Sequence, residues 1–294
     1  MTTPAACLKV TGEDALMFLQ GQFTQELRAD RAGSAAYGLL LSQKGKVMAD
    51  AFILRVSERE FWLVSYRVPA AVIRERLEAY VIADDVVIAD ETEGWGLLSL
   101  IGDSARGWLQ AEVGVLPAAG ALLRRADGGL IFQGRRGSAE SWEWLAPRAA
   151  WPATPPLPVL TAGDLERARL SAGVPAIPDD LGPTDLPNEG GLEDSAISYT
   201  KGCYLGQEVM ARLKAMGQVR RRLKRVQGTG AVPSTHPADV YQGGKRVGEV
   251  RTWIDDGAGG WIGLSMLSLL SLDASAPLSL SPADSGTITV VGDP

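Results

Sequence analysis

The chain has 294 residues, 46% of them hydrophobic and 22% charged, and its formal net charge is −6 at pH 7. This composition argues against a disordered chain and suffices for a buried core in two or three structural units. The acidic balance also argues against broad electrostatic attraction to nucleic acid or to anionic membranes.

A few residue types narrow the chemistry further. Cys7 and Cys203 are too few for a disulfide framework or for the four thiolates that usually hold an iron–sulfur cluster. The single histidine, His236, excludes catalytic triads and histidine-rich metal sites, and we predict no metal site. The apolar run 261–272 is shorter than the roughly 18 residues that span a bilayer, and the start of the sequence lacks the features of a secretion signal. We therefore expect a cytoplasmic protein.

The first half of the sequence alternates patterns typical of helices and strands. Thr11 with Asp14 predicts a helix start, and Pro69 opens a second helix. The turn 43–46 joins two predicted strands. Taken in chain order, the predicted strands cover 35–41 and 47–56 and lie near Val86, Leu97, Leu122, Leu130 and Trp142, with a short helix from Asp103.

In the second half of the sequence, the predicted secondary structure changes from loops and a helix to short strands. A Pro-rich connector over 151–158 precedes a helix capped by Thr161 and Asp164, and an irregular loop follows over 173–191. Beyond about residue 220, short strands separated by Gly, Pro and Asp turns are typical of a small β-barrel. These strands are predicted at 222–227, 245–253, 261–268 and 287–291. The sequence therefore predicts an α+β protein with domains over 1–219 and 220–294.

The segment 201–208, with the sequence KGCYLGQE, places one thiol between a lysine and two glycines. From Gly206 onward apolar residues recur at helical intervals up to a stop at Gly217, so Cys203 is expected just before a helix. The helix dipole and the Lys201 ammonium would favour the thiolate, giving a reactive sulfur. The alternative is a buried, inert cysteine.

This segment resembles the signature of the YgfZ-type folate-binding proteins, which are implicated in iron–sulfur protein maturation and tRNA modification. They are relatives of the aminomethyltransferase (T-protein) of the glycine cleavage system. The segments 10–24 and 165–175 are also similar, although the aminomethyltransferases share them. The resemblance implies two α+β subdomains and a C-terminal barrel in a ring around a central channel that binds tetrahydrofolate or a related folate.

The resemblance and the local chemistry together give a set of candidate site residues. We assign the reactive role to Cys203 with Lys201, and folate binding to Asp50, Tyr204, Gln207, Glu208 and Arg212. A carboxylate such as Asp50 can pair with the amidine-like edge of a pterin, and a tyrosine hydroxyl or an amide can position a ligand. The basic run 220–225 is either a contact for the glutamate tail of folate or a solvated strand face.

Two departures from the aminomethyltransferase pattern bear on activity. Ala49 stands where those enzymes carry the first of two aspartates, and Ser171 stands where they tend to carry glutamate. Both point away from amine chemistry, so we predict a folate-binding maturation factor whose partners are iron–sulfur client or assembly proteins. Direct binding to nucleic acid or membranes is not expected. The alternatives are a tetrahydrofolate-dependent aminomethyltransferase and a partner in tRNA modification.

Overall fold

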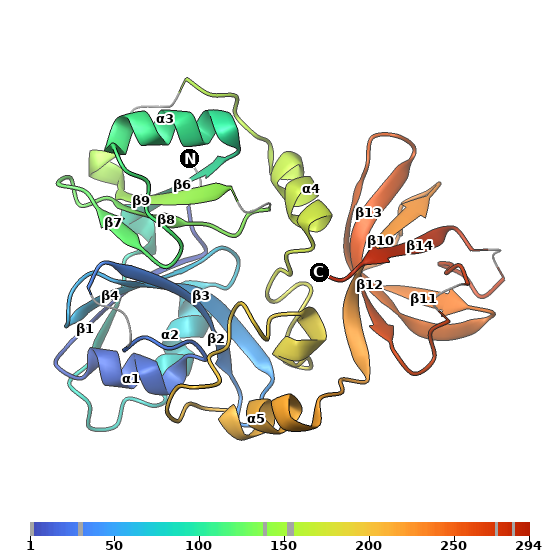
Figure 1. Cartoon of the computed structure of the whole chain (residues 1–294), viewed down its shortest axis with the longest axis horizontal. Helices are drawn as coiled ribbons and strands as arrows, with labels where there is room; N and C mark the ends of the chain where they lie inside the picture. The colour runs from blue at the N-terminus through green and yellow to red at the C-terminus, as the bar shows by residue number, and fades with distance from the viewer. Residues whose placement is uncertain (1–2, 29–31, 138–139, 152–155, 274–275, 284–285) are drawn as a thin grey trace. The chain divides into compact units, whose positions relative to one another are not determined.

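A computed structural model describes residues 3–28, 32–137, 140–151, 156–273, 276–283 and 286–294 (Figure 1). The chain divides into two compact units. Unit 1 comprises Met1–Arg135, Ala139–Pro158 and Asp194–Met210, and unit 2 comprises Arg136–Ser138, Val159–Glu193 and Ala211–Pro294. The segment 220–294, predicted as a separate domain, thus belongs to unit 2 with part of the preceding chain, and the boundary at 219/220 stays a prediction.

Unit 1 contains two antiparallel sheets. The larger has the order β2-β3-β4-β1-β5, with β1 Ala6–Thr11, β2 Ser34–Leu41, β3 Val47–Arg55, β4 Glu60–Ser65 and β5 Val87–Asp90. The smaller has the order β6-β9-β8-β7, with β6 Trp95–Ile101, β7 Leu122–Arg124, β8 Leu130–Gln133 and β9 Ser141–Pro147. The helices are α1 Ala15–Gln22, α2 Ala70–Glu78 and α3 Asp103–Val113, with short 3-10 turns η1 Thr92–Gly94 and η2 Arg148–Ala150.

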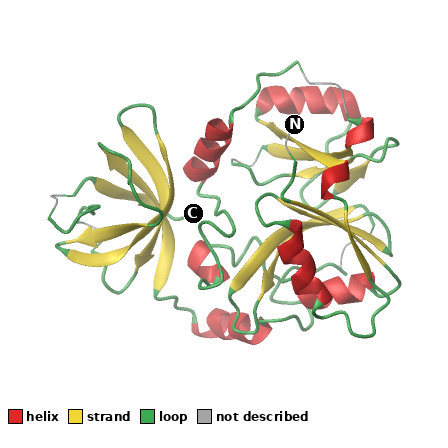
Figure 2. Cartoon of the chain, turned by 180° about the vertical axis from the view of Figure 1, so that it is seen from behind, coloured by secondary structure: helices red, strands yellow, loops and turns green. Residues whose placement is uncertain are grey.

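The main core of unit 1 lies between its two sheets. Phe52 and Leu54 of β3 pack there with Leu97 of β6 and Leu145 of β9. The opposite face of the smaller sheet is covered by α3, which buries Leu109, while α1 and α2 lie on the side of the larger sheet away from the smaller one (Figure 2). Because both faces of the larger sheet are covered, β3 is buried along nearly its whole length.

Unit 2 combines helical segments with a C-terminal sheet. It contains α4 Ala162–Ala172, the 3-10 turn η3 Pro187–Gly190 and the end of α5 Gln207–Met216. The sheet has the order β11-β12-β13-β10-β14, with β10 Arg221–Thr229, β11 Ala238–Gln242, β12 Lys245–Asp255, β13 Gly260–Ser268 and β14 Ile288–Gly292. Two further bridges, Tyr241–Ser279 and Leu278–Ile288, extend the pairing beyond the edge strands.

The α+β prediction is confirmed in its main lines. The helix after Gly206 and the capping box of Thr161 with Asp164 are both present. The predicted helix start at Thr11 was wrong, since Thr11 ends β1 and α1 follows Asp14. Residues 152–155 of the predicted connector lie outside the described residues, and the closed barrel, the ring and its channel stay predictions. Within the described ranges, every helix is too short or too polar to cross a bilayer.

Candidate functional site

Two carboxylates are buried in the space between the two sheets of unit 1. Asp50 of β3 lies on the same face as Phe52, because side chains alternate along a strand, and Glu143 of β9 lies on the same face as Leu145. Only 8% of Asp50 and none of Glu143 is exposed. Buried acids are rare unless they are paired or functional, so these two define the place where chemistry is to be sought.

Asp50 is held by two hydroxyl groups. The Tyr37 hydroxyl donates to Oδ2 at 2.8 Å, and Ser65 Oγ donates to Oδ1 at 3.2 Å. Burial raises the pKa of Asp50, while these hydrogen bonds and the positive charge of Arg135 oppose the rise. Burial and the neighbouring carboxylate raise the pKa of Tyr37 well above its usual value, so Tyr37 remains a hydrogen-bond donor.

Glu143 has a similar set of donors. The Tyr66 hydroxyl donates to Oε1 at 2.8 Å, and Ser99 Oγ donates to Oε2 at 2.7 Å. The backbone of Gly134 approaches so closely that a Cβ there would lie 2.8 Å from Oε1. Ser141, one alternation away on β9, is fully buried and its hydroxyl has no hydrogen-bond partner among the residues that the structure describes. Such an unpaired hydroxyl is costly without a water or a ligand.

Arg135, two residues after the end of β8, contacts the tyrosine partners of both carboxylates. Its backbone N–H donates to the Tyr66 hydroxyl at 3.1 Å, and its guanidinium lies 4.2 Å from the centroid of the Tyr37 ring. Its Nη2 atom donates to Ser195 Oγ at 3.4 Å. We call the following residues the inter-sheet cluster: Tyr37, Asp50, Ser65, Tyr66, Ser99, Arg135, Ser141 and Glu143.

The segment that carries Cys203 is anchored into unit 1 by Lys201. The Lys201 ammonium donates to the backbone carbonyls of Gln20, Phe23 and Gln25 at 2.7, 2.5 and 2.7 Å. Only 4% of Lys201 is exposed, and burial lowers its pKa from 10.5 to about 8. All three ammonium protons are therefore engaged by carbonyls, and these contacts favour an anchoring role for Lys201 over the predicted role beside the thiol.

Cys203 itself is exposed. Two contacts follow it closely: Leu205 N donates to Gly21 O at 3.3 Å, and Gly206 adopts a φ of +87° in the tight approach to Ser42. The alternative of a buried, inert cysteine is therefore wrong for Cys203. It describes Cys7, which has no exposed surface and whose pKa is raised by burial and by nearby acids.

The other predicted site residues lie around the start of α5. Tyr204 is buried. Its burial, and to a smaller extent the electrostatic effect of Tyr199, raise its pKa to about 12. Gln207 is half-buried and donates through Nε2 to Lys201 O at 3.5 Å. Glu208 and Arg212 are exposed. The structure thus brings Tyr204 and Gln207 together with Lys201. Arg135, which lies near Asp50, contacts Ser195, eight residues before Cys203. The folate-binding role of each residue stays a prediction.

Sequence reasoning missed Glu143, Tyr37, Tyr66 and Arg135. A signal for Glu143 was present, because it interrupts an apolar strand in which Trp142 and Trp144 pack against α3. Within the described ranges, no three His, Cys, Asp or Glu side chains are arranged as metal ligands.

Comparisons with known proteins identify the fold and the family. A family profile described as the GCVT N-terminal domain matches residues 3–118. The glycine cleavage system aminomethyltransferase T from Bartonella henselae shares the fold, with a TM-score of 0.76 over 96% of this chain and 85% of that chain, at 17% identity. The chain thus has the fold of this aminomethyltransferase and matches the GCVT N-terminal domain over residues 3–118.

Three curated relatives refine this assignment. The tRNA-modifying protein YgfZ of Edwardsiella ictaluri is 30% identical over 246 residues, which cover 76% of this chain and 68% of the relative. The mitochondrial iron-sulfur cluster assembly factor IBA57 of Mus musculus is 26% identical over 311 residues, or 97% and 81% of the two chains. An aminomethyltransferase of Rubrobacter xylanophilus is 29% identical over 262 residues, or 81% and 67%. The chain belongs to the YgfZ-type family, which is related to the aminomethyltransferases.

Proposed function

We propose that this chain is a tetrahydrofolate-binding factor that assists the maturation of iron–sulfur proteins, with Cys203 as its exposed reactive group. The observation that carries the proposal is an exposed thiol on a segment whose backbone is fastened by a buried lysine. The relatives named as an iron–sulfur cluster assembly factor and as a tRNA-modifying protein support the same class of activity. We place the protein in the cytoplasm, as the sequence suggests.

The inter-sheet cluster supports the folate part of the proposal. A pterin ring presents several N–H donors on its amidine-like edge, and the carboxylate oxygens of Asp50 and Glu143 are acceptors for such donors. The Ser141 hydroxyl, which has no hydrogen-bond partner among the described residues, adds a polar group that a ligand or a water can satisfy. We infer that Asp50 and Glu143 would hold the pterin, and that bound tetrahydrofolate supplies nitrogen atoms able to carry a one-carbon unit.

Calorimetric titration with tetrahydrofolate tests the folate part. Glu143→Gln and Asp50→Asn should each weaken binding at least tenfold, because each removes a charged acceptor from the proposed pterin site. Glu112→Gln, on the exposed surface of α3, is the matched control and should bind like the wild type. Absence of binding to the wild type, or equal binding by all four proteins, would contradict the proposal.

The thiol part is tested in cells that lack their own copy of this protein. Cys203→Ala should bind tetrahydrofolate like the wild type, which verifies its folding, but should fail to restore the activity of iron–sulfur enzymes. Full restoration by Cys203→Ala would eliminate the role of the thiol while leaving the folate site intact.

An aminomethyltransferase is the second candidate, favoured by the Rubrobacter relative and by the buried Asp50 carboxylate. In that case, supplying an aminomethyl donor should give methylenetetrahydrofolate, and Asp50→Asn should abolish its formation. Binding without turnover would leave the maturation factor. For a role in tRNA modification we expect no direct contact with nucleic acid. Salt-sensitive binding of tRNA to the purified protein would reverse that expectation.

A further inference from the structure

The last residues of the sequence lie against a row of cations on β10. Lys224 Nζ contacts Asp293 Oδ1 at 2.6 Å, and Arg222 Nε lies 3.6 Å from the same oxygen. Arg225 Nε donates to the Asp293 carbonyl oxygen at 3.0 Å. The hydrogen bond from Lys224 and the positive charges of Arg222 and Arg225 lower the pKa of Asp293. These groups all belong to unit 2, and together they form a carboxylate-binding site that the chain itself occupies.

Two glycines make room for the residue that follows. Gly173 ends α4 and Gly191 ends η3, and both adopt left-handed conformations with φ of +72° and +71°. A Cβ on Gly173 would lie 2.6 Å from Pro294 Cα, and a Cβ on Gly191 would lie 3.3 Å from Pro294 Cγ. Pro294 therefore contacts both ends of the segment 173–191, where a larger side chain would displace it.

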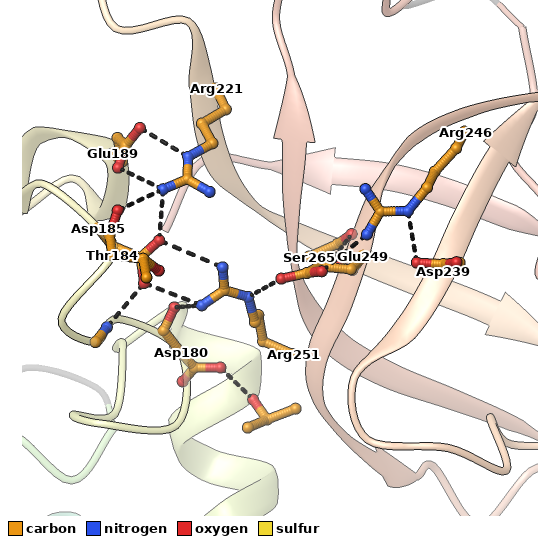
Figure 3. A network of polar contacts seen from close by, with 12 residues as sticks. Asp180, Thr184, Asp185, Glu189, Arg221, Asp239, Arg246, Glu249, Arg251 and Ser265 are labelled. Atoms are coloured by element: carbon orange, nitrogen blue, oxygen red, sulfur yellow. Dashed lines mark hydrogen bonds and ion pairs between the residues drawn. The ribbon is translucent and has the colours of Figure 1, made fainter.

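The middle of this segment is fastened by a different and more deeply buried network, drawn in Figure 3. Asp185 pairs with Arg221 at 2.8 Å and with Arg251 at 3.0 Å, and the Thr252 hydroxyl donates to Asp180 at 2.5 Å. Both aspartates have no exposed surface. Breaking a buried pair is strongly unfavourable because it leaves an uncompensated charge in a dry environment. The middle of the segment is therefore held more strongly than a surface ion pair would hold it.

The ion pairs of Asp293 with Lys224 and Arg222 lie at the protein surface. The Asp293 side chain is 58% exposed, so water and salt screen its attraction to Lys224 and Arg222. Arg222 also pairs with Glu193 at 3.0 Å, just after Gly191, so one guanidinium joins the end of the segment to Asp293. An exposed contact of this kind costs little to break, so it can open without unfolding of the sheet.

We propose that Asp293 and Pro294 form an electrostatic strap. The β10 cations Arg222, Lys224 and Arg225 bind the Asp293 carboxylate and hold Pro294 between Gly173 and Gly191. Release of the strap by salt or by loss of the charge loosens both ends of the segment 173–191, whereas its middle remains fixed by Asp180 and Asp185. The proposal is independent of folate binding, since none of these residues belongs to the inter-sheet cluster.

Hydrogen exchange of the full chain tests the strap. Val174 N donates to Arg169 O and Leu192 N donates to Pro187 O, so each end of the segment carries a protected amide. In Asp293→Asn these two amides should exchange about two to five times faster at low salt, as expected for loss of an exposed ion pair. The wild type in 1 M NaCl should approach the variant, and the variant should respond little to salt.

Asp239→Asn is the matched control, because it removes the exposed carboxylate that pairs with Arg246 at 2.6 Å on the same sheet. It should leave both amides unchanged. A second variant, the chain ending at Gly292, should reproduce the effect of Asp293→Asn, while unchanged exchange in β13 verifies that the sheet is folded. The proposal is overturned if both variants leave the two amides as slow as in the wild type, or if Asp239→Asn accelerates them equally.

Discussion

Replacing Lys201 with methionine tests how the Cys203 segment is held. Methionine keeps an unbranched apolar stem but removes the donor that serves the carbonyls of Gln20, Phe23 and Gln25. Hydrogen bonds to a charged group contribute about 1.5–3 kcal/mol each, so three of them amount to roughly 5–9 kcal/mol. The substitution also relieves the burial of a charge, and a pKa lowered to about 8 corresponds to on the order of 3 kcal/mol. The lost bonds outweigh this relief, so we expect Lys201→Met to lower the free energy of unfolding by about 3 kcal/mol.

The assay is urea unfolding followed by tryptophan fluorescence. This signal reports mainly on unit 1, which holds six of the eight tryptophans. The matched control is Lys9→Met, because Lys9 is 34% exposed and makes one ion pair with Glu60 at 3.4 Å. An exposed pair of this kind contributes at most about 1 kcal/mol. Native-state exchange of the Leu205 amide adds a local readout, and it should accelerate only in Lys201→Met.

The reasoning would be refuted if Lys201→Met were as stable as Lys9→Met, or more stable than the wild type. That outcome would mean that the desolvation free energy of the buried ammonium exceeds the stabilisation from its three hydrogen bonds to carbonyls. The segment would then be positioned by its backbone contacts and by Tyr204 rather than by the lysine.

Three further predictions concern single ionisable groups. Between pH 8 and 10.5 the stability of the wild type should rise relative to that of Lys201→Met. The reason is that Lys201 releases its proton near pH 8 in the folded protein and near pH 10.5 in the unfolded chain. A stability difference between the two proteins that does not change with pH would contradict the lowered pKa. A thiol reagent should titrate Cys203 alone in the folded protein and both cysteines in urea, and two reactive thiols without urea would place Cys7 outside the core. Asp50→Asn should raise the thermal midpoint at pH 7, since burial raises the pKa of Asp50 and its ionised form is costly. This gain should fade below about pH 4, where the unfolded carboxyl is also protonated, and a lowered midpoint would show that the bonds from Tyr37 and Ser65 outweigh the charge.

The sequence predicted those helix ends that are determined by neighbouring residues. The capping box of Thr161 and Asp164 and the left-handed Gly217 that ends α5 were both readable, because caps and stops depend on a few neighbouring residues. The prediction of a helix start at Thr11 was wrong because it, too, relied on a local signal. Its pattern with Asp14 imitates a helix cap, yet the apolar residues before it pair with β4 and β5 and carry β1 through Thr11. Long-range pairing decided that position against the local signal.

The inter-sheet cluster was less accessible to prediction because it is assembled across two sheets. Asp50 comes from β3 and Glu143 from β9, and their common location depends on the two sheets packing face to face. Nothing in a single strand indicates that Tyr66 bonds to a glutamate 77 residues further along the chain. The resemblance to a family pointed to Asp50, whereas Glu143 required the fold.

Lys201 shows most clearly why neighbours in sequence need not cooperate in chemistry. Lys201 and Cys203 are separated in the sequence by Gly202 alone, and this proximity suggested an ammonium that assists a thiolate. In the structure the lysine turns inward to three carbonyls at 2.5–2.7 Å, while the cysteine remains at the surface. A buried anchor that fixes the backbone and an exposed group on that backbone are complementary, since a segment tied down at Lys201 can present Cys203 at little cost in conformational entropy. We therefore propose that the lysine acts on the sulfur through position rather than through charge. A variant that keeps the charge but moves it, such as Lys201→Arg, should not preserve the arrangement.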